Sequence, residues 1–385
     1  MKNIREGSRL SFLEATSIIV GHGVGAGILA VPYLAAHNSL RELLLVLCFC
    51  YLYSLLLHLI IAELSYNNDG AQFITCLDRE LFSGKLKTIL TYAAFFLLGL
   101  SVIVNVSAYL TGAAKVFEEW FGLSQIPGIL LFYVIGAGVV FFGLKLVGVC
   151  EKYSVAVIVA LVGVLLFFTL RGETQPLPHG FKGLTNALAL FGVISFSLSA
   201  VMSTPQVVKG LQGDKKRIRG AIAAGLGINA GIILLLTLTT LLAVGEALPK
   251  DKALVELSAR LGGAARIIGF IFTLFALVTS FWANTLNLRD IVHEQTKWNE
   301  KLSWLAASLP CLLIALLSMA DFIDLTLFAS AVQVVTGIGV IVAYYFSRKR
   351  VREAALVGRF GTVPFLILVV LCSLLASLNP FLHVR

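Results

Sequence analysis

Charge is scarce in this sequence. Only 13% of its 385 residues are Asp, Glu, Lys or Arg, whereas 58% are hydrophobic. Soluble domains carry about 25% charged and roughly 45–50% apolar residues, so this composition cannot cover a water-facing surface. The apolar residues fall in blocks of about 20 or more, the length that crosses a ~30 Å hydrocarbon core. A soluble globular protein is therefore excluded, and the sequence predicts an integral membrane protein.

Several other patterns are also missing. The ~10-residue segments of alternating hydrophobicity that build transmembrane β-barrels are absent, and lipid offers no partners to open backbone, so the apolar blocks must be helices. The six cysteines lack the paired spacing of metal sites, and we interpret them as buried hydrophobic residues. His-Glu-x-x-His and Gly-x-Ser-x-Gly motifs are absent. We therefore expect neither an intramembrane enzyme nor a cofactor.

The apolar blocks predict an all-α membrane protein with eleven transmembrane helices. A basic stretch at residues 1–5 precedes the first block, but no cleavage site follows it, so we expect this helix to be retained. Segments 67–86 and 246–264 are too polar to span, and residues 250–263 have the pattern of a short amphipathic surface helix. The predicted spans cover residues 11–37, 41–66, 87–115, 127–144, 150–170, 183–208, 217–245, 265–290, 301–319, 323–346 and 361–380.

The positive charges predict how these helices are oriented. With the N-terminus in the cytoplasm, 21 of the 30 Lys and Arg residues lie on the cytoplasmic side. Cytoplasmic loops are the ones that carry excess Lys and Arg. We therefore predict a multi-pass protein of the plasma or inner cell membrane, with an extracytoplasmic C-terminus. The net charge of +9 is then explained by loops beside anionic lipid of the bilayer, and no nucleic acid partner is expected.

Two predicted helices carry helix-breaking sequence near mid-membrane. The first has four glycines between Gly21 and Gly27, and the sixth has three serines in residues 195–199, followed by Pro205. Interrupted helices at matching places in two halves indicate the central binding site of a transporter. The sequence therefore predicts a substrate site between helices 1 and 6.

The spacing of the two breaks predicts an inverted repeat within a single transporter domain. Five helices separate the breaks, and because five is odd, the second half starts from the opposite side of the membrane. Residues 10–170 form the first repeat and residues 183–346 the second, with 361–380 as an additional helix. The halves share no strong sequence similarity, so the repeat is inferred from topology alone.

The glycine-rich break suits a zwitterion and a cation. Free N–H groups at the start of the outer half-helix favour a carboxylate, and free carbonyls at the end of the inner half favour a cation. The alternative is close helix packing, because Gly21/Gly25 and Gly23/Gly27 both fit the small-xxx-small pattern. The matching break in helix 6 favours the binding interpretation.

Three polar residues lie deep within the predicted membrane helices, and each has two possible roles. His22 lies within the first break, where an ionisable group is a candidate proton site. It could equally be a neutral ring hydrogen-bonded to the unwound backbone. Thr279 and Ser280 place two hydroxyls deep in helix 8, where they could bind a hard cation such as sodium or bond carbonyls of their own helix.

Three stretches resemble known transporters. Residues 21–33, Gly-His-Gly-Val-Gly-Ala-Gly-Ile-Leu-Ala-Val-Pro-Tyr, resemble the first-helix signature of the amino acid/auxin permease group of the amino acid–polyamine–organocation superfamily. Residues 205–219 are similar to the region after helix 6 in bacterial hydroxy/aromatic amino acid permeases. Residues 275–280, with Asp290, resemble their helix 8. The first and third stretches also resemble sodium-coupled neurotransmitter-type transporters, and the likeness covers residues 10–350.

The resemblance implies a five-plus-five inverted-repeat fold that holds a small amino acid between helices 1 and 6. The backbone around the first break would receive the substrate carboxylate, at Gly23, Gly25, Ala26 and Gly27. The helix 6 backbone would receive the ammonium group, at Ser195, Ser197 and Ser199. The implied sodium ligands are Gly21, Val24, Ala276, Thr279 and Ser280.

Two departures from the relatives bear on the coupling ion. Ile28 stands where relatives with a second sodium place an asparagine, which favours one sodium ion. Some proton-coupled relatives carry a lysine in the middle of helix 5, whereas Lys152 here lies at the predicted cytoplasmic start of that helix. A proton is the alternative coupling ion, and His22 is the residue that would carry it. Glu63 and Asp290 are interpreted either as gate or helix-end anchors or as solvated helix ends.

These patterns predict a secondary active amino acid permease that works by ion-coupled alternating access, with one sodium ion at a helix 1/helix 8 site. The first alternative is a proton-coupled permease that uses His22. A channel is a weaker alternative, because its continuous water path would need rings of polar groups, and only scattered polar residues are present.

Overall fold

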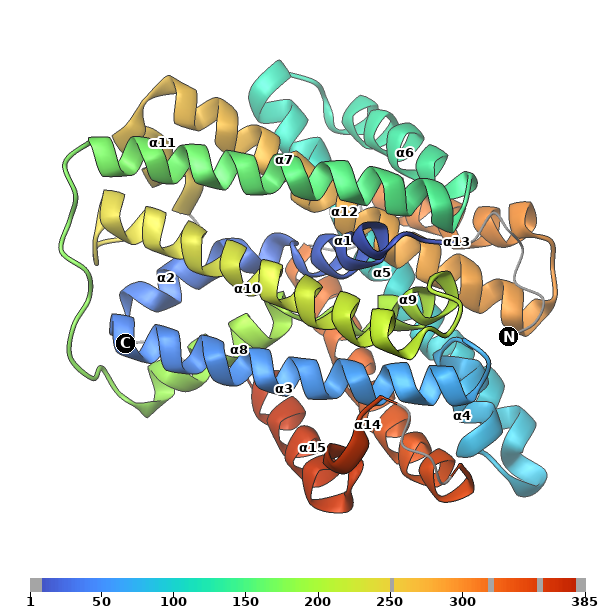
Figure 1. The fold of residues 1–385 in the computed structure, drawn as a ribbon. Coiled ribbons are helices and arrows are strands. Elements are labelled where there is room, and N and C mark those ends of the chain that lie inside the picture. Colours follow the sequence, from blue (N-terminus) through green and yellow to red (C-terminus); the bar gives the residue numbers. More distant parts are fainter. Residues whose placement is uncertain (1–8, 250–252, 318–321, 352–355, 379–385) are drawn as a thin grey trace.

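The structure of the chain, a computed structural model, describes residues 9–249, 253–317, 322–351 and 356–378, and all regular structure in these ranges is helical (Figure 1). The helices of the first half are α1 (Phe12–Gly23), η2 (Ala26–Ala30), α2 (Val31–Ala36), α3 (Leu40–Asn67), α4 (Phe73–Glu80), η3 (Gly84–Leu86), α5 (Lys87–Phe121), α6 (Gln125–Phe141) and α7 (Leu144–Arg171). Those of the second half are α8 (Leu184–Ser197), η4 (Val201–Ser203), α9 (Thr204–Gly210), α10 (Lys215–Val244), α11 (Ala253–Leu261), α12 (Gly263–Thr296), α13 (Glu300–Leu317), α14 (Phe322–Arg350), η5 (Gly358–Gly361) and α15 (Val363–Ser377).

Each of the eleven predicted spans corresponds to a helix or to an interrupted helix. Within the described residues, seven helices are long and apolar enough to cross a membrane, and α1 together with the helix after its break makes an eighth. The apolar helices α6 and α15 are shorter. The total of eleven spans therefore stays a prediction. The basic residues 1–5, the predicted start of the amphipathic helix at 250, and the ends predicted at 319 and 380 lie outside the described residues.

The start of helix 5 was predicted wrongly. The helix was expected at residue 150, but α7 begins at Leu144, directly after Gly143, whose φ of 90° turns the chain into the helix. The polar residues Lys145, Glu151 and Lys152 made this turn look like a loop. Lys145 is exposed but pairs with the buried Glu14 of α1 at 2.6 Å, which ties the first turn of α7 to α1.

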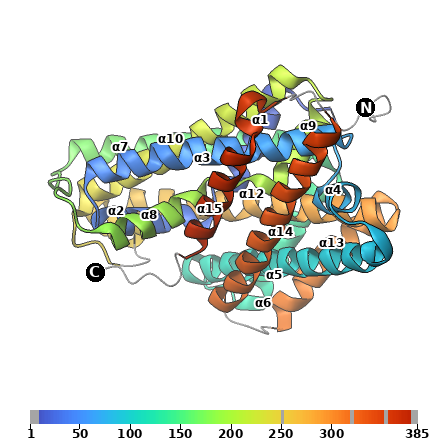
Figure 2. The ribbon, with the colours of Figure 1, turned by 90° about the horizontal axis from the view of Figure 1, so that it is seen from below.

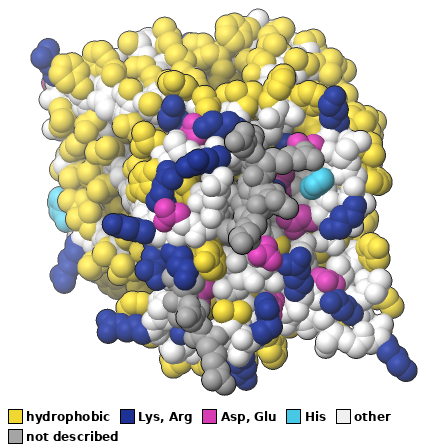
Figure 3. Space-filling view, turned by 45° about the vertical axis from the view of Figure 1, so that its right-hand side comes forward, with side chains coloured by type: hydrophobic (Ala, Val, Ile, Leu, Met, Phe, Trp, Pro, Cys, Tyr) yellow, Lys and Arg dark blue, Asp and Glu magenta, His cyan; other side chains and the backbone are white. Residues whose placement is uncertain are grey.

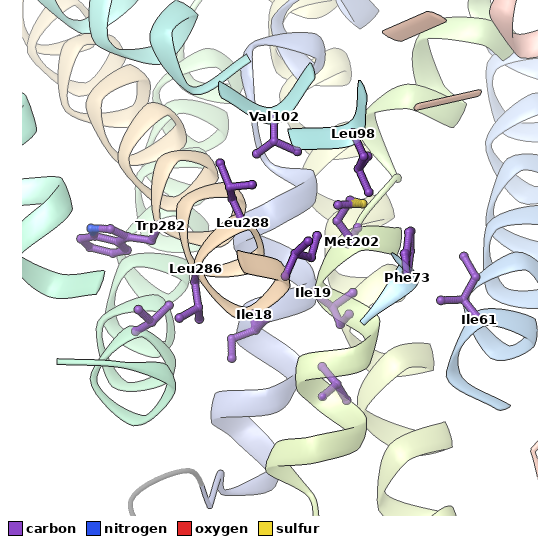
Figure 4. Close-up of a cluster of buried hydrophobic side chains, with 14 of the residues drawn as sticks. Ile18, Ile19, Ile61, Phe73, Leu98, Val102, Met202, Trp282, Leu286 and Leu288 are labelled. Carbon is purple, nitrogen blue, oxygen red and sulfur yellow. The ribbon is translucent and has the colours of Figure 1, made fainter. Parts of the chain in front are cut away.

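Helix α1 lies at the centre of the bundle. It packs against α7, α10 and α12, and nearly all of its side chains are buried. Ile18 and Ile19 pack among side chains of several other helices, including Leu286 and Leu288 of α12 and Met202 of η4 (Figure 4). A capping box between Ser11 and Glu14 starts the helix. The central helix that carries the glycine break is therefore well anchored at its N-terminal end.

The two interrupted helices run in opposite directions, side by side (Figure 1). The backbone N–H of Leu10, just before α1, donates to the carbonyl of Gly210 at the end of α9 at 2.9 Å. At the other end, α2 packs against α8. The first interrupted helix bends by 56° at its break. This antiparallel arrangement brings the two breaks to the same depth in the bundle.

Helices α14 and α15 pack on one side of the bundle, against α3, α5 and α8 (Figure 2). Glu63 of α3 holds this side in place. It is fully buried and accepts hydrogen bonds from the Tyr344 hydroxyl at 2.9 Å and from the N–H groups of Leu356 and Val357 at 2.6 and 2.7 Å. The solvated-end interpretation is therefore wrong for Glu63, which anchors α3 to α14 and to the segment that follows.

Charged side chains gather at one end of the molecule. Figure 3 brings forward the end that carries α4 and α9, where Lys, Arg, Asp and Glu cluster, and the surrounding surface is largely hydrophobic. Asp290 lies near this end but is buried, paired with Arg289 at 2.8 Å. The solvated-end interpretation is wrong for Asp290 as well. The distribution is that of a membrane protein with one strongly charged aqueous face.

Candidate substrate and cation site

The first break separates α1 from η2. Helix α1 ends at Gly23, and the Gly25 N–H donates back to the Gly23 carbonyl at 2.9 Å. Ala26 and Gly27 then begin η2, and the first N–H groups of a helix have no partner further upstream in that helix. Of the backbone groups implied for a substrate carboxylate, the N–H groups of Ala26 and Gly27 are therefore the better placed.

The first two glycines of the break, Gly21 and Gly23, let other helices approach closely. A Cβ built on Gly21 would lie 1.7 Å from a carboxylate oxygen of Glu151, on α7. A Cβ on Gly23 would lie 2.0 Å from the side-chain nitrogen of Asn229, on α10. At separations this short, a methyl group at either position would displace the side chain that faces it.

The last two glycines of the break, Gly25 and Gly27, face two further helices. A Cβ on Gly25 would lie 2.9 Å from the hydroxyl of Ser280, on α12, and one on Gly27 would lie 2.7 Å from the ring of Phe196, on α8. All four glycines therefore serve close packing, as the small-xxx-small pattern indicated, and the helix is also broken. Close helix packing and an interrupted helix therefore both apply to these glycines.

The second break lies between α8 and α9. Helix α8 ends at Ser197, and the Ala200 N–H leaves the helical ladder to donate to Nε2 of His58 at 3.0 Å. The other ring nitrogen of His58 contacts the Ser54 carbonyl at 2.6 Å and must therefore carry the proton. This neutral histidine of α3 holds the unwound backbone in place. The sequence analysis missed it, because a lone histidine in an apolar span shows no motif.

The two breaks are in direct contact. The Asn229 amide donates to the Ser197 carbonyl at 3.0 Å, and that same carbonyl would lie 3.0 Å from a Cβ on Gly23. His22 bridges the breaks a second time, because its Nδ1 lies 2.7 Å from the Ser203 hydroxyl of η4. His22 is thus bonded to a side chain, whereas the non-proton reading expected the backbone of its own turn.

The implied sodium ligands come from α1 and α12, which pack together. The Ser280 hydroxyl donates to the Val24 carbonyl at 3.4 Å. The Thr279 hydroxyl donates to the carbonyls of Phe275 at 2.9 Å and Ala276 at 3.3 Å, which is the own-helix bonding weighed above. The structure therefore brings Val24 and Ser280 into contact, with Thr279 and Ala276 on the adjoining turn of α12.

The sequence as a whole matches one family model. The model describes the tryptophan/tyrosine permease family and matches residues 8–378. This chain belongs to the tryptophan/tyrosine permease family. It is a multi-pass membrane transporter, and the expectation that it is no enzyme is confirmed. The resemblance to permeases is confirmed at this level, whereas the finer assignment to the amino acid/auxin permease group stays a prediction. The chain matches no curated protein sequence.

Solved structures share the permease's fold at low sequence identity. MhsT, in complex with L-phenylalanine, is 12% identical with a TM-score of 0.73, and the match covers 96% of this chain and 99% of that one. A manganese transporter from Eremococcus coleocola, bound to an aromatic bis-isothiourea substituted compound, is 13% identical with a TM-score of 0.64, covering 96% and 85%. Mhp1, a nucleobase-cation-symport-1 family transporter with bromovinylhydantoin bound, is 15% identical with a TM-score of 0.62, covering 98% and 93%.

The side chains of α8 around the break of the permease differ in their surroundings. Ser195 faces α3, where its hydroxyl lies 3.4 Å from the Cys50 sulfur. Ser197 is buried beside Gly27, and its hydroxyl has no hydrogen-bond partner among the described residues. Phe196 lies between them and is 51% exposed. Phe196 is therefore the exposed aromatic ring at the end of α8, and it also faces Gly27 of the first break.

Buried oxygen atoms without partners gather at the breaks of the permease. In the part of the chain that the structure describes, these include both carboxylate oxygens of Glu151, the amide oxygen of Asn229 and the hydroxyl oxygen of Ser197. These oxygens are free to accept hydrogen bonds, as are other buried side-chain atoms of the bundle such as those of Gln72 and Gln206. Glu151 and Asn229 were not among the predicted site residues. The one available signal was a lone acid and a lone amide within apolar segments.

Proposed function

We propose that this permease is a secondary active transporter that takes up an aromatic amino acid together with a cation. The observation that carries the proposal is the contact between the two breaks, where Gly23, Ser197 and Asn229 meet among buried oxygen atoms without partners. The tryptophan/tyrosine family model and the exposed ring of Phe196 favour an aromatic side chain. The phenylalanine held by MhsT, a protein of the same fold, agrees with this.

In the proposed complex, the substrate lies between the breaks. Its carboxylate binds the N–H groups of Ala26 and Gly27, at the positive end of the helical segment that begins there. Its ammonium group binds carbonyls of the broken end of α8, in residues 195–199, at the negative end of that helix. Phe196 packs on the substrate ring, an arrangement worth about 0.5–1.5 kcal/mol beyond area burial.

The remaining features of the mechanism follow from the antiparallel pair of broken helices. Residues 10–170 and 183–346 form inverted repeats that rock about the central site, which opens alternately to the two sides. One sodium ion binds among Gly21, Val24, Ala276, Thr279 and Ser280. The strongly charged end of the molecule faces the cytoplasm of the cell in whose plasma or inner membrane the permease lies, and the C-terminus faces outside.

A proton is the second candidate for the coupling ion. His22 supports it, because this side chain joins the end of α1 to Ser203 between the breaks, and Asn287 of α12 contacts the same hydroxyl at 3.4 Å. Protonation of His22 would change the contact between both interrupted helices. A channel has no comparable support, since only scattered polar residues are present and paired breaks are typical of transporters.

Uptake by purified protein tests the proposed function directly. In proteoliposomes, we expect labelled tryptophan, tyrosine or phenylalanine to accumulate when sodium is imposed outside, and glycine or aspartate to be excluded. Proteoliposomes with a proton gradient and no sodium separate the two coupling ions. The proposed function is wrong if monodisperse, correctly inserted protein takes up no amino acid of a complete panel.

Replacement of Thr279 by alanine tests the sodium ligands. The hydroxyl already bonds to its own helix, so we expect Thr279→Ala to fold normally. Loss of one oxygen ligand should raise the sodium concentration needed for half-maximal uptake by about 10-fold or more, with the order of preferred amino acids unchanged. Thr273→Ala is the matched control, because Thr273 bonds to the Gly269 carbonyl in the same way, further from the break. An unchanged sodium response in Thr279→Ala would show that the assignment of sodium ligands to α12 is wrong.

A further inference from the structure

Glu151 is a buried acid without a partner. It lies on α7 and is fully buried, and neither of its carboxylate oxygens has a hydrogen-bond partner within residues 9–249, 253–317, 322–351 and 356–378. Removing a charge from water without compensation is one of the most unfavourable events in folding, so buried charges are paired or coordinate metals. An ionised Glu151 therefore requires a positive partner, and none is hydrogen-bonded to it among the described residues.

The carboxylate rests on the backbone of the break. A Cβ built on Gly21 would lie 1.7 Å from one oxygen and 3.0 Å from the other, so the group covers the last turn of α1. Gly21 and Val24 are three residues apart, about 4.5 Å along a helix axis. The Val24 carbonyl in turn contacts the Ser280 hydroxyl. Glu151 thus stands at the edge of the cation site that α1 and α12 form.

The neighbouring basic residues of α7 have other contacts. Lys145 pairs with both carboxylate oxygens of Glu14, at 2.8 and 2.6 Å. The ammonium group of Lys152 lies 4.6 Å from the ring centre of Tyr153. Asn229, on the other face of the break, donates its amide to Ser197 and not to Glu151. Neither lysine is therefore paired with Glu151, and a bound cation would neutralise its carboxylate in the ionised form.

We propose that Glu151 is an anionic ligand of the coupling sodium ion, in addition to Gly21, Val24, Ala276, Thr279 and Ser280. This inference rests on the proposed function. Hard cations prefer carboxylate, carbonyl and hydroxyl oxygens, and these are the groups that α7, α1 and α12 bring together. The site is neutral with one sodium ion bound and carries an uncompensated negative charge without it. Sodium is therefore required to complete the packing of α7 on the break, before any substrate arrives.

Thermal unfolding of the purified protein in detergent tests this ligand without relying on transport. Sodium chloride, against choline chloride at equal ionic strength and fixed pH, should raise the Tm of the unmodified permease in the absence of amino acid. Glu151→Gln should lose this sodium-dependent rise, and Glu151→Asp should need about 10-fold more sodium for the same rise. Lys152→Gln is the matched control, because it removes a charge from the adjacent position and should leave the rise unchanged.

A second variant covers the case in which Glu151→Gln does not fold. Gly21→Ala keeps the carboxylate but places a methyl group in its position, and we expect the same loss of the sodium-dependent rise. Gly163→Ala is its control, because a Cβ on Gly163 of α7 meets no other atom within 4 Å. A sodium-dependent rise that persists in either Glu151→Gln or Gly21→Ala overturns the inference. So does a permease whose Tm responds to pH but not to sodium.

The two proposals fail in different experiments. If the unmodified permease transports aromatic amino acids with sodium, and Glu151→Gln retains the same sodium dependence of both Tm and uptake, the ligand assignment is wrong and the transport function stands. If sodium stabilises the unmodified protein through Glu151, but no amino acid of the panel is taken up, the ligand assignment stands and the substrate proposal is wrong.

Discussion

Replacement of Gly25 by leucine is expected to abolish uptake while the protein still folds and inserts. A Cβ at this position would already lie 2.9 Å from the Ser280 hydroxyl, so a leucine side chain must push α12 away or extend into the space between the breaks. Either outcome disturbs the N–H groups of Ala26 and Gly27 that are proposed to bind the substrate carboxylate. Because a misplacement of about 1 Å can cost ~100-fold in activity, we expect uptake to fall below detection.

The effect of Gly25→Leu is measured by uptake in proteoliposomes and by the rise in Tm that the substrate produces. Gly163→Leu is the control, because nothing lies within 4 Å of a Cβ there. It should retain both signals. Monodisperse Gly25→Leu protein that transports at the unmodified rate would show that the glycine-rich break does not hold the substrate.

Replacement of Glu63 by alanine is expected to cause the largest loss of stability. It removes the acceptor of two buried backbone N–H groups, at Leu356 and Val357, and of the Tyr344 hydroxyl. Each buried donor left without a partner costs about 1–3 kcal/mol, so we expect a loss of about 3 kcal/mol or more. The attachment of α15 and the end of α14 to α3 should weaken before the central helices separate.

Thermal unfolding in detergent measures this loss. Tyr344→Phe is the matched variant, because it removes a single hydrogen bond to the same carboxylate, and it should lose only about 1 kcal/mol. Glu63→Gln keeps an acceptor oxygen and should lie between the two. Equal Tm values for Glu63→Ala and Tyr344→Phe would mean that the backbone N–H groups of Leu356 and Val357 find other acceptors.

Much of the fold was predictable because lipid limits the possible structures. Every apolar block of sufficient length is helical, and the interruptions at Gly25 and around Ser199 lie where glycine, serine and Pro205 had indicated them. Helix ends were less predictable. The first turns of α7 contain Lys145 and Glu151, which look solvated in the sequence, but Glu151 is fully buried and Lys145, although exposed, pairs with Glu14 of α1.

The site could be predicted in its backbone but not in its side chains. The glycines in the sequence predict that other helices approach closely. Only the packing shows that Gly21 faces Glu151 and that Gly23 faces Asn229, which lie on helices more than 100 residues away in the sequence. His58 could not be found for the same reason, since its role depends on the Ala200 N–H of another helix. Pairings of this kind depend on how the helices are arranged, and the local patterns of a sequence do not reveal that arrangement.

The bond between Leu10 and Gly210 fastens the inner ends of both interrupted helices. Leu10 is also buried against Gly148 and Gly210, where an added Cβ would lie 2.7 and 2.4 Å from its side chain. In the proposed alternating-access cycle, opening the charged end of the molecule would break these contacts. One hydrogen bond and one leucine are worth about 1 and about 1.5–3 kcal/mol. A free energy of this size lies within the range by which the binding or release of a solute can shift a two-state equilibrium.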